Sequence, residues 1–419
     1  MAKRRILLTT LGSYGDLHPY IAIAHGLLRR GHAAILASSP FYREKIESAG
    51  VPFHPLNAFA FDEITPELIR KLFDPIRGPE FLIRDCIMPA LENAWRDTVS
   101  GAEGADLLVS HPLTFATQLV AEKFHLPWAS VSLAPMSFFS RHNPPVLAPA
   151  PGLWRILGPS LLRWFLSLGK VSTASWVKPY HRLRKELGLP LGPNPLFEGS
   201  FSPYLILAIF SRELATPDPD WPAQAVITGF PFYDNDGSSE LSPEIEDFLN
   251  AGPAPLVFTL GSSAVLHAGH FYTESAKAAR LLDKRAVLLV GKDTANRPTS
   301  LPPEIGVFDY APYSQLFPRA AAIVHQGGVG TTGQAMRAGR PMLVMPFGFD
   351  QQDNAHRVEK RGIARTISRK KYSAETAAAA LRKLFQDPKV EDRAASVGAG
   401  VRAENGVESA CDHLEQLLN

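Results

Sequence analysis

The sequence predicts an α/β protein built from two Rossmann-like domains that face each other across a cleft. The chain has 419 residues, which is more than one ordinary hydrophobic core encloses, so about two domains are expected. A plan of apolar strand, glycine-containing loop and amphipathic helix occurs in both halves, as it does in doubly wound α/β folds. Between the halves, a polar stretch at residues 234–242 has the Asp, Gly and Ser content of a linker.

The first half begins with an apolar stretch at residues 5–10 that is predicted to form a strand. Residues 11–18 follow as a loop, and Pro19 stands in the first turn of a helix that ends at Gly31, since proline is tolerated at that end of a helix. Further strands are predicted at residues 33–38, 105–110, 203–210 and 226–231, with helices at 41–49 and 81–99.

The second half repeats this alternation. It has predicted strands at residues 255–260, 286–290, 320–324 and 341–346, and predicted helices at 271–282 and 331–338. Gly339 ends the latter helix, because glycine readily adopts a left-handed C-cap. The last helix carries an apolar stripe at helical spacing, formed by Val407, Cys411, Leu414 and Leu418. The expected division is therefore 1–233, a linker at 234–242, 243–402, and a terminal helix at 403–419.

The loop between the strand at 320–324 and the helix at 331–338 is a candidate anion site. A helix N-terminus offers unpaired backbone N–H groups and the positive end of the helix dipole, which suit a phosphate. Asp350 and Gln351 follow the next strand, at the carboxyl edge where α/β sheets bind ligands. The order of these groups predicts contacts to a diphosphate and then to hydroxyls. The loop itself contributes His325, Gly327, Gly328, Gly330, Thr331 and Thr332.

The loop after the first strand places Asp16 at a second carboxyl edge. A carboxylate facing a cleft can take a proton from a hydroxyl as a new bond forms. Asp also commonly caps helices, and the residues alone favour a cap of the following helix. His18 is either a second polar contact or a histidine satisfied within the loop. His111 follows the strand at 105–110 and so lies at the same edge, where it orients the carboxylate, touches a ligand or is structural.

The segment from Tyr310 to Val358 contains, in order, an aromatic residue, a proline, HxGG, a pair of threonines and P-x(3)-DQ-x(2)-NA. It resembles the nucleotide-sugar signature of family 1 glycosyltransferases, the UDP-glycosyltransferase-like enzymes of the GT-B fold. The loop at 11–18 resembles the G-S-x-G-D-x-x-P loop of bacterial lipid, sterol and antibiotic glycosyltransferases. The similarity covers nearly the whole chain and is greatest to the branch of bacterial rhamnosyltransferases and sterol-type glucosyltransferases.

The resemblance implies a role for each residue at a matching position. Asp16 is the base that deprotonates the acceptor hydroxyl, assisted by His18 or His111, although relatives more often have an acidic residue at the position of His111. Tyr310 stands where plant-type relatives have a tryptophan that stacks on the nucleobase, and Tyr313 replaces a common glutamine. The implied donor-binding residues are Gly15, Ser262, Tyr310, Tyr313, His325, Gly327, Gly328, Gly330, Thr331, Thr332, Asp350 and Gln351.

In this resemblance residues 1–233 bind the acceptor, residues 243–402 bind the nucleotide sugar, and the helix at 403–419 packs back on the first domain. The implied reaction is an inverting transfer of a hexose, of glucose or rhamnose type, from a UDP-sugar or dTDP-sugar. The acceptor is a hydroxyl of a lipophilic small molecule such as a lipid, sterol, terpenoid, polyphenol or antibiotic. A non-catalytic nucleotide-sugar-binding protein and a GT-B sugar-nucleotide epimerase are the alternatives. Retention of both Asp16 and Asp350 argues against the first, and the apolar middle segment argues against the second.

Composition excludes several other classes. Forty-three Lys and Arg against 41 Asp and Glu leave a formal charge of +2, so no basic field indicates a nucleic acid partner. Cys86 and Cys411 have no metal or disulfide spacing, which fits a reducing compartment. Without a signal-peptide core, a cytoplasmic location is expected. Two DxD patterns, at 218–220 and 234–236, lie in Pro- and Gly-rich connections, so neither a metal nor a permanently bound cofactor is expected.

The middle segment at residues 135–195 is irregular and rich in proline. Large apolar side chains are mixed with arginines at 153–157 and 161–166. One interpretation is an amphipathic wall over an apolar acceptor pocket, with peripheral contact to a membrane surface. The other is an ordinary core-packing helix with arginines at its solvent edge. No run reaches the ~18 to 20 apolar residues of a membrane-spanning helix.

Overall fold

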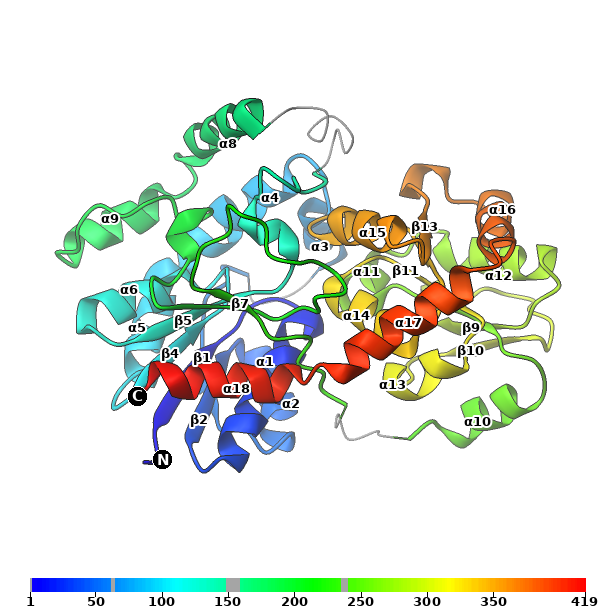
Figure 1. The fold of residues 1–419 in the computed structure, drawn as a ribbon, viewed down its shortest axis with the longest axis horizontal. Helices are drawn as coiled ribbons and strands as arrows, with labels where there is room; N and C mark the ends of the chain where they lie inside the picture. The colour runs from blue at the N-terminus through cyan, green and yellow to red at the C-terminus, as the bar shows by residue number, and fades with distance from the viewer. Residues whose placement is uncertain (1, 62–64, 148–158, 235–239) are drawn as a thin grey trace. The chain divides into compact units, whose positions relative to one another are not determined.

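The computed structural model describes residues 2–61, 65–147, 159–234 and 240–419. The chain forms two compact units, which are coloured by residue number in Figure 1. Unit 1 comprises Met1–Tyr233 together with Asn405–Asn419, and unit 2 comprises Asp234–Glu404. The predicted linker at 234–242 begins where unit 2 begins, and its residues 235–239 lie outside the described residues.

The described part of unit 1 contains a seven-stranded parallel sheet in the order β3-β2-β1-β4-β5-β6-β7. Leu7 in the central strand lies opposite Ile35 on one side and Leu108 on the other. Strands are therefore added outward in both directions from β1. The strands are β1 (Arg5–Thr9), β2 (Ala33–Ser38), β3 (Phe53–Pro55), β4 (Leu107–Ser110), β5 (Trp128–Ser132), β6 (Leu205–Ala208) and β7 (Ala225–Ile227).

Helices cover both faces of this sheet, because parallel strands need crossover connections. The α-helices of unit 1 are α1 (Tyr14–Arg29), α2 (Arg43–Ser48), α3 (Pro66–Leu72), α4 (Gly78–Glu80), α5 (Leu91–Gly101), α6 (Phe115–Phe124), α8 (Pro159–Thr173), α9 (Lys178–Glu186) and α18 (Gly406–Leu417). Short 3-10 or π turns are η1 (Pro40–Tyr42), η2 (Phe81–Ile87), η3 (Met88–Ala90), η4 (Pro135–Phe138) and η5 (Glu198–Ser200).

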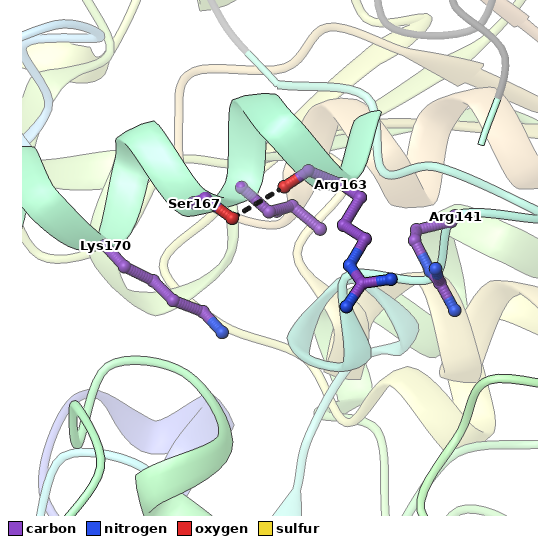
Figure 2. Close-up of a pocket in the computed structure, with 5 residues that line it drawn as sticks. Arg141, Arg163, Ser167 and Lys170 are labelled. Atoms are coloured by element: carbon purple, nitrogen blue, oxygen red, sulfur yellow. Dashed lines mark hydrogen bonds between the residues drawn. The ribbon is translucent and has the colours of Figure 1, made fainter. Parts of the chain in front are cut away.

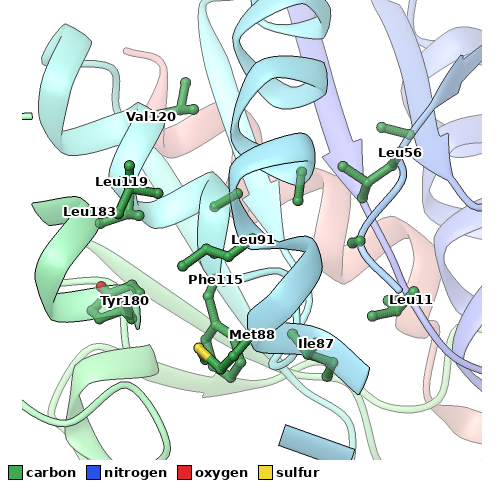
Figure 3. Close-up of a cluster of buried hydrophobic side chains, with 14 of the residues drawn as sticks. Leu11, Leu56, Ile87, Met88, Leu91, Phe115, Leu119, Val120, Tyr180 and Leu183 are labelled. Carbon is green, nitrogen blue, oxygen red and sulfur yellow. The ribbon is translucent and has the colours of Figure 1, made fainter. Parts of the chain in front are cut away.

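Alternate residues of the central strands enter two hydrophobic clusters, one on each face of the sheet. Leu7 and Leu108 join the cluster formed with α5, α6 and α9, part of which is drawn in Figure 3. Ile6 and Leu8 join the opposite cluster, formed with α1 and α18. Successive strand residues point to opposite faces, so a strand covered on both faces is apolar along its whole length. This explains why β1 and β4 appear in the sequence as continuous apolar runs.

The terminal helix α18 packs on α1 within unit 1. Gly26 of α1 lies at this contact, since a Cβ atom there would come within 2.7 Å of Cys411 Sγ and 2.8 Å of Val407 Cγ1. The apolar stripe of α18 therefore contacts α1, and Leu418 is the C-cap that follows it. At the edge of the contact, Arg30, the C-cap of α1, forms ion pairs with three carboxylates of α18. They belong to Glu408, Asp412 and Glu415.

The described part of unit 2 contains a six-stranded parallel sheet in the order β10-β9-β8-β11-β12-β13. Its strands are β8 (Leu256–Thr259), β9 (Ala286–Leu289), β10 (Ile305–Phe308), β11 (Ala322–His325), β12 (Met342–Val344) and β13 (Ala364–Thr366). Its α-helices are α10 (Pro243–Asn250), α11 (Gly261–Ala264), α12 (Phe271–Leu281), α13 (Tyr313–Leu316), α14 (Val329–Ala338), α15 (Gln351–Lys360), α16 (Ala374–Phe385) and α17 (Val390–Ala403). The 3-10 turns are η6 (Val265–His267), η7 (Thr294–Asn296), η8 (Phe317–Arg319) and η9 (Arg369–Lys371). The prediction of two Rossmann-like α/β domains is confirmed.

Several predicted elements differ from the structure. Helix α1 begins at Tyr14 rather than near Pro19, because Ser13 supplies the N-cap. The helix predicted at 81–99 is divided by the π turn η2 and by η3, which contains Pro89. Gly261 begins the short helix α11 directly after β8. Four strands, β3, β5, β10 and β13, were not predicted; β3 and β13 have only three residues, too few to show a period.

Other predictions are confirmed. The strand at 33–38 has the predicted bounds. Gly339 ends α14 in the left-handed conformation, with φ of 66° and ψ of 36°. The helix therefore ends at the predicted C-cap, where a glycine readily adopts the left-handed conformation.

The same substitution at two helical glycines is expected to have opposite effects. Gly26→Ala would place its Cβ 2.7 Å from Cys411 Sγ, and overpacking of this kind costs about 1–3 kcal/mol. We expect a lower melting temperature, since this cost exceeds the ~1 kcal/mol gained when a helical glycine is replaced. In α8, a Cβ on Gly169 would meet Phe197 at an ordinary 3.8 Å, so Gly169→Ala should be neutral or stabilising. Parallel thermal unfolding checks this, and a similar shift in both variants would contradict the packing account.

Candidate functional site

Each sheet reverses its direction of strand addition beside one central strand, and the loops at that point carry the predicted polar residues. In unit 1, β2 and β4 lie on opposite sides of β1, so the loops after β1 and β4 begin side by side at the carboxyl edge. In unit 2 the same holds for the loops after β8 and β11. Open α/β sheets bind ligands at such points. Each unit therefore has one candidate site.

Asp16 lies in the first turn of α1, where it completes a capping box. Its Oδ2 accepts the backbone N–H of Ser13 at 2.7 Å, and Ser13 Oγ accepts the backbone N–H of Gly15 at 3.2 Å. The side chain of Asp16 is 28% exposed. Asp16 is thus the third helical residue and Ser13 is the N-cap, which corrects the expectation that Asp16 itself caps the helix. Gly15 likewise lies in the helix and not in a loop.

His111, from the loop after β4, directs its ring at the other oxygen of Asp16. Nε2 lies 3.3 Å from Asp16 Oδ1, and the side chain is 2% exposed. Nδ1 accepts the backbone N–H of Leu113 at 3.1 Å, so Nδ1 carries no proton. The neutral ring therefore holds its proton on Nε2 and donates it to Asp16. In this geometry His111 orients the carboxylate, and Asp16 remains the proton acceptor of the pair.

Aromatic side chains surround the start of α1. Tyr42 donates its hydroxyl to the Gly12 carbonyl at 2.8 Å, and its ring lies with centroids 5.4 Å from Tyr14 and 5.1 Å from Phe41. Tyr14 and Phe41 are 37% and 72% exposed, so they present apolar surface near the N-terminus of α1. Gly12 has φ of +132°, and a Cβ there would collide with the carboxylate of Asp16.

His18 follows Asp16 by two residues in the same helix, so their side chains point about 200° apart around the helix axis. The His18 ring packs between Tyr14 and Tyr233, at centroid distances of 5.3 and 5.4 Å. The structure therefore brings His111 to Asp16 and places His18 in the aromatic cluster. A contact between His18 and a ligand stays a prediction.

In unit 2, α14 begins directly after the glycine loop. Its N-cap, Gly328, makes no side-chain cap, so the N–H groups of the first turn face the loop without an intrahelical partner. Gly327 has φ of +88°, and a Cβ there would lie 2.8 Å from Val344 Cγ1 and 2.9 Å from the Gln351 carbonyl oxygen. Glycine is therefore required at this position. The open amides of Val329, Gly330 and Thr331 and the helix dipole are groups of the kind that bind anions, so anion binding here stays a prediction.

Four buried polar side-chain atoms around this loop lack a hydrogen-bond partner among the described residues. They are His325 Nε2, Gln326 Oε1, Thr332 Oγ1 and Asn354 Oδ1. Thr331 differs, because its hydroxyl accepts from Gln326 Nε2 at 3.3 Å. Buried polar groups are normally satisfied, so several exceptions at one loop indicate that a polar ligand completes it.

His325 ends β11 and is fully buried. Its Nδ1 accepts the backbone N–H of Gly327 at 3.0 Å, so the proton of the neutral ring lies on Nε2. Burial lowers the pKa of His325 to about 3, because desolvation disfavours the imidazolium. His325 is therefore a neutral hydrogen-bond donor at physiological pH.

Asp350 and Gln351 lie at the start of α15, next to the glycine loop. Gln351 Oε1 accepts the backbone N–H of Phe347 at 2.8 Å, so this oxygen shapes the loop after β12. Asp350 Oδ2 accepts from Asn354 Nδ2 at 2.7 Å, and the same Nδ2 donates to the Gly327 carbonyl at 3.0 Å. Asn354 was not predicted as a site residue. The available signal was its place as the asparagine of the DQ-x(2)-NA pattern.

The other predicted donor residues have different surroundings. Tyr310 follows β10 and is 51% exposed. Tyr313 stacks on Phe317 with centroids 4.3 Å apart, and its hydroxyl bonds with Thr259 Oγ1 at 2.8 Å. Burial raises the pKa of Tyr313 to about 12. These are the contacts of a packing residue, so a role in base recognition stays a prediction. Ser262 lies in α11, directly after β8.

The middle segment lines a basic pocket. Residues 148–158, which include the predicted stretch at 153–157, lie outside the described residues. Figure 2 shows the side chains of α8 that line the cavity together with Arg141, which follows η4. The cavity has a volume of about 450 Å³ and is lined by Arg141, Arg163, Leu166, Ser167 and Lys170. The lining is mainly polar, whereas Trp164, Leu168 and Val171 are exposed. The lining of this cavity is thus more polar than an apolar acceptor pocket, and the role of α8 as an amphipathic wall stays a prediction.

The acidic DxD patterns have structural partners. Asp220 accepts from Ser140 Oγ at 2.8 Å, and Asp234 pairs with Arg337 at 2.7 Å. Asn235 and Asp236 lie outside the described residues. Within the ranges that the structure describes, no three His, Cys, Asp or Glu side chains are grouped to hold a metal ion. No helix in those ranges has the length and apolar content needed to cross a membrane.

Known proteins match this chain along its length. Residues 6–127 match the glycosyltransferase family 28 N-terminal domain, and residues 275–417 match the C-terminal domain of erythromycin biosynthesis protein CIII-like proteins. O-mycaminosyltylonolide 6-deoxyallosyltransferase of Streptomyces fradiae is 33% identical over 98% of this chain and 97% of its own length. The sterol 3-beta-glucosyltransferase of Neurospora crassa is 29% identical over 99% of this chain, which spans only 27% of that longer protein.

Solved structures share the fold. The glycosyltransferase of kitacinnamycin aligns over 100% of both chains with a TM-score of 0.77 and 21% identity. A spinosyn rhamnosyltransferase complexed with thymidine diphosphate aligns over 98% of this chain and 100% of its own, with a TM-score of 0.69 and 17% identity. Two parallel-sheet units of this kind are the architecture of those enzymes.

The neutral state of His325 leads to a prediction about pH. If Nε2–H donates to a diphosphate, His325→Asn should weaken binding of a nucleotide sugar about 10-fold or more, since a hydrogen bond to a charged group contributes about 1.5–3 kcal/mol. Asparagine is chosen because its Oδ1 can still accept the Gly327 amide. In the parent protein the affinity should stay flat between about pH 8 and pH 5.5, because an imidazole with a pKa of about 3 does not titrate there.

Titration calorimetry with an intact nucleotide sugar, whose diphosphate does not titrate in this range, provides the measurement. An affinity that rises as the pH falls through about 6.5, the ordinary histidine value, and that loses this rise in His325→Asn would show a cationic ring. An unchanged affinity in a folded His325→Asn variant would remove His325 from the site.

Proposed function

Because the chain belongs to the family 1 glycosyltransferases of GT-B fold, we propose that it transfers a hexose from a UDP-sugar or dTDP-sugar to a hydroxyl of a lipophilic small molecule, with inversion. It is a glycosyltransferase of the antibiotic or secondary-metabolite type. The observation that carries the proposal is the carboxylate of Asp16, which His111 and Ser13 hold at the switch point of unit 1.

In this proposal the two units divide the substrates. Residues 1–233, with the helix at 403–419, bind the acceptor, and residues 243–402 bind the donor. The support is the distribution of chemistry, since the carboxylate lies in unit 1 and the open helix N-terminus lies in unit 2. Nucleophile activation and leaving-group stabilisation thus belong to different units.

The reaction is a single displacement at the anomeric carbon. The acceptor oxygen forms a bond to C1 while its proton passes to Asp16, and the bond from C1 to the diphosphate oxygen breaks. Asp16 suits the task because Oδ2 is fixed by the Ser13 amide and Oδ1 is oriented by His111 Nε2–H. His111 cannot be the base in this arrangement, because its Nδ1 is occupied by the Leu113 amide and its Nε2 already holds a proton.

The departing diphosphate is stabilised by the donor loop of unit 2. The first-turn amides of α14, the Nε2–H of His325 and the hydroxyl of Thr332 are preorganised donors for the negative charge that develops. Asp350 and Gln351 then hold the sugar hydroxyls, and Tyr310 stacks on the nucleobase. Thymidine diphosphate in the related rhamnosyltransferase structure supports a dTDP-sugar as one of the two donors.

The acceptor is lipophilic in this proposal because unit 1 exposes aromatic rings near the N-terminus of α1, the helix that carries Asp16. Tyr14 and Phe41 are exposed and both pack on Tyr42, and burial of an apolar ligand against such rings is favourable. Two relatives are named for a macrolide-type acceptor, O-mycaminosyltylonolide, and for sterols. Both kinds of acceptor are largely apolar molecules with hydroxyl groups.

The Asp16→Asn variant separates catalysis from capping. Asparagine can accept the Ser13 amide but then turns its NH2 toward His111 Nε2–H, so a loss of about 1 kcal/mol in stability is expected. If Asp16 is the base, transfer to an aliphatic alcohol should fall by ~10² to 10⁴. A phenolic acceptor of low pKa should be affected less, because it loses its proton more easily. Rates are measured by product mass at saturating donor, with donor affinity measured separately.

The matched control is Ser13→Ala, which removes the N-cap hydroxyl and its 3.2 Å hydrogen bond to Asp16 Oδ2 but keeps the 2.7 Å bond from the backbone N–H to the same oxygen. It should lower the melting temperature about as much as Asp16→Asn and leave most of the activity. If both variants lose activity equally, capping and not proton transfer explains the loss. A stable Asp16→Asn variant that glycosylates an aliphatic alcohol at near the parent rate would remove Asp16 as the base.

The reaction is proposed to be metal-independent, since the amides of α14 and His325 supply the stabilisation that a cation gives in other transferases. Transfer should proceed at an unchanged rate in excess EDTA. The assay compares EDTA-treated protein before and after addition of Mg²⁺ or Mn²⁺. Activity that is lost with EDTA and restored by either cation would overturn this part of the mechanism.

A further inference from the structure

Asn354 connects the glycine loop to the carboxylate at the start of α15. It is fully buried in α15. Its Nδ2 lies 3.0 Å from the Gly327 carbonyl oxygen and 2.7 Å from Asp350 Oδ2. The two partners follow different strands, β11 and β12. One side chain therefore joins the two loops that form the candidate donor site.

The orientation of the carboxamide follows from its partners. A backbone carbonyl and a carboxylate can only accept hydrogen bonds, so the NH2 group of Asn354 must face both of them. Both of its hydrogens are then used. Oδ1 is left buried and without a partner among the described residues, which is an unfavourable state for a polar atom. A purely structural position would be expected to satisfy the whole carboxamide.

The hydrogen bonds of Asn354 Nδ2 hold the Asp350 side chain close to the glycine loop. Gly327 also packs against α15, because a Cβ there would lie 2.9 Å from the Gln351 carbonyl oxygen. The Gly327 carbonyl and the Asp350 carboxylate thus keep one relative position as long as the NH2 group bridges them. Without the bridge, the hydrogen-bonded link from the Gly327 carbonyl to the Asp350 carboxylate is lost.

We propose that Asn354 is a positioning residue, which holds the carboxylate of Asp350 in register with the glycine loop so that sugar and diphosphate are recognised together. This inference rests on the proposed function, in which the loop binds the diphosphate and Asp350 binds the sugar. In this proposal a nucleoside diphosphate contacts only the glycine loop, whereas the intact nucleotide sugar contacts both the loop and Asp350. The ratio of the two affinities reports the contribution of the sugar.

The test is a double-mutant cycle on this ratio. Asp350→Ala, Asn354→Ala and the double variant are compared with the parent for binding of UDP or dTDP and of the matching nucleotide sugar. Each single variant should lower the sugar contribution about 10-fold, and the double variant should lower it no further, because coupled residues are not additive. The donor KM should rise by a similar factor. Should Asn354→Ala fail to fold, Asn354→Ser, which keeps one hydroxyl donor, replaces it.

A chemically matched control is Asn296→Asp. Asn296 Nδ2 likewise donates to two acceptors, here the carbonyl oxygens of Val265 and Val290, at 3.0 Å each. Loss of the Asn296 carboxamide should lower the free energy of unfolding without changing the ratio of nucleotide-sugar to nucleoside-diphosphate affinity. Asn354→Asp should lower both the free energy of unfolding and this ratio. Equal ratios in the parent and the Asn354 variants, or additive effects with Asp350→Ala, would overturn the inference. Failure of the parent to bind any nucleotide sugar would instead overturn the proposed function.

Discussion

The structure depends on a constraint of parallel sheets: strands can be added on both sides of a central strand only if the connections change direction at one point. The two loops that meet there diverge to opposite faces of the sheet, and their first residues stay at the same edge. In unit 1 this brings Asp16 and His111, which are far apart in the sequence, to a separation of 3.3 Å between Oδ1 and Nε2. In unit 2 it places the loops of Gly261 and His325 at neighbouring strand ends. The order of the strands in each sheet therefore determines which polar side chains lie together at its carboxyl edge.

At both points, side chains with a structural task also provide the chemistry. The carboxylate of Asp16 fixes the start of α1 with one oxygen and receives His111 with the other. The ring of His325 supports the Gly327 amide through Nδ1, which leaves Nε2–H available. In each case one heteroatom is fixed to the backbone, so the other is held in a defined direction without further ligands. Preorganisation in this protein therefore comes from local backbone amides.

Much of this could be predicted from the sequence because the signals are local. The glycine loop, the helix after it and its C-cap at Gly339 depend on residue types within a few positions, and they are confirmed. Asp16 was placed in a loop because Pro19 was expected in the first turn of the helix, whereas the capping box at Ser13 starts the helix one turn earlier. The neutral state of His325 and the bridging of Asn354 could not be predicted, since both depend on burial by distant strands. The polar lining of α8 depends likewise on which side of that helix is covered.

The assignment of α18 to unit 1 has a consequence for biosynthesis. Unit 1 is discontinuous, because Asn405–Asn419 follow the whole of unit 2 in the sequence. During translation, the groove of α1 around Gly26 and the adjoining apolar residues remain uncovered until unit 2 has been synthesised. Domains generally fold as units while the chain emerges, so unit 2 can be complete before unit 1 is. Over that interval an exposed apolar groove on the nascent chain is a target for chaperones and for misassociation between neighbouring nascent chains.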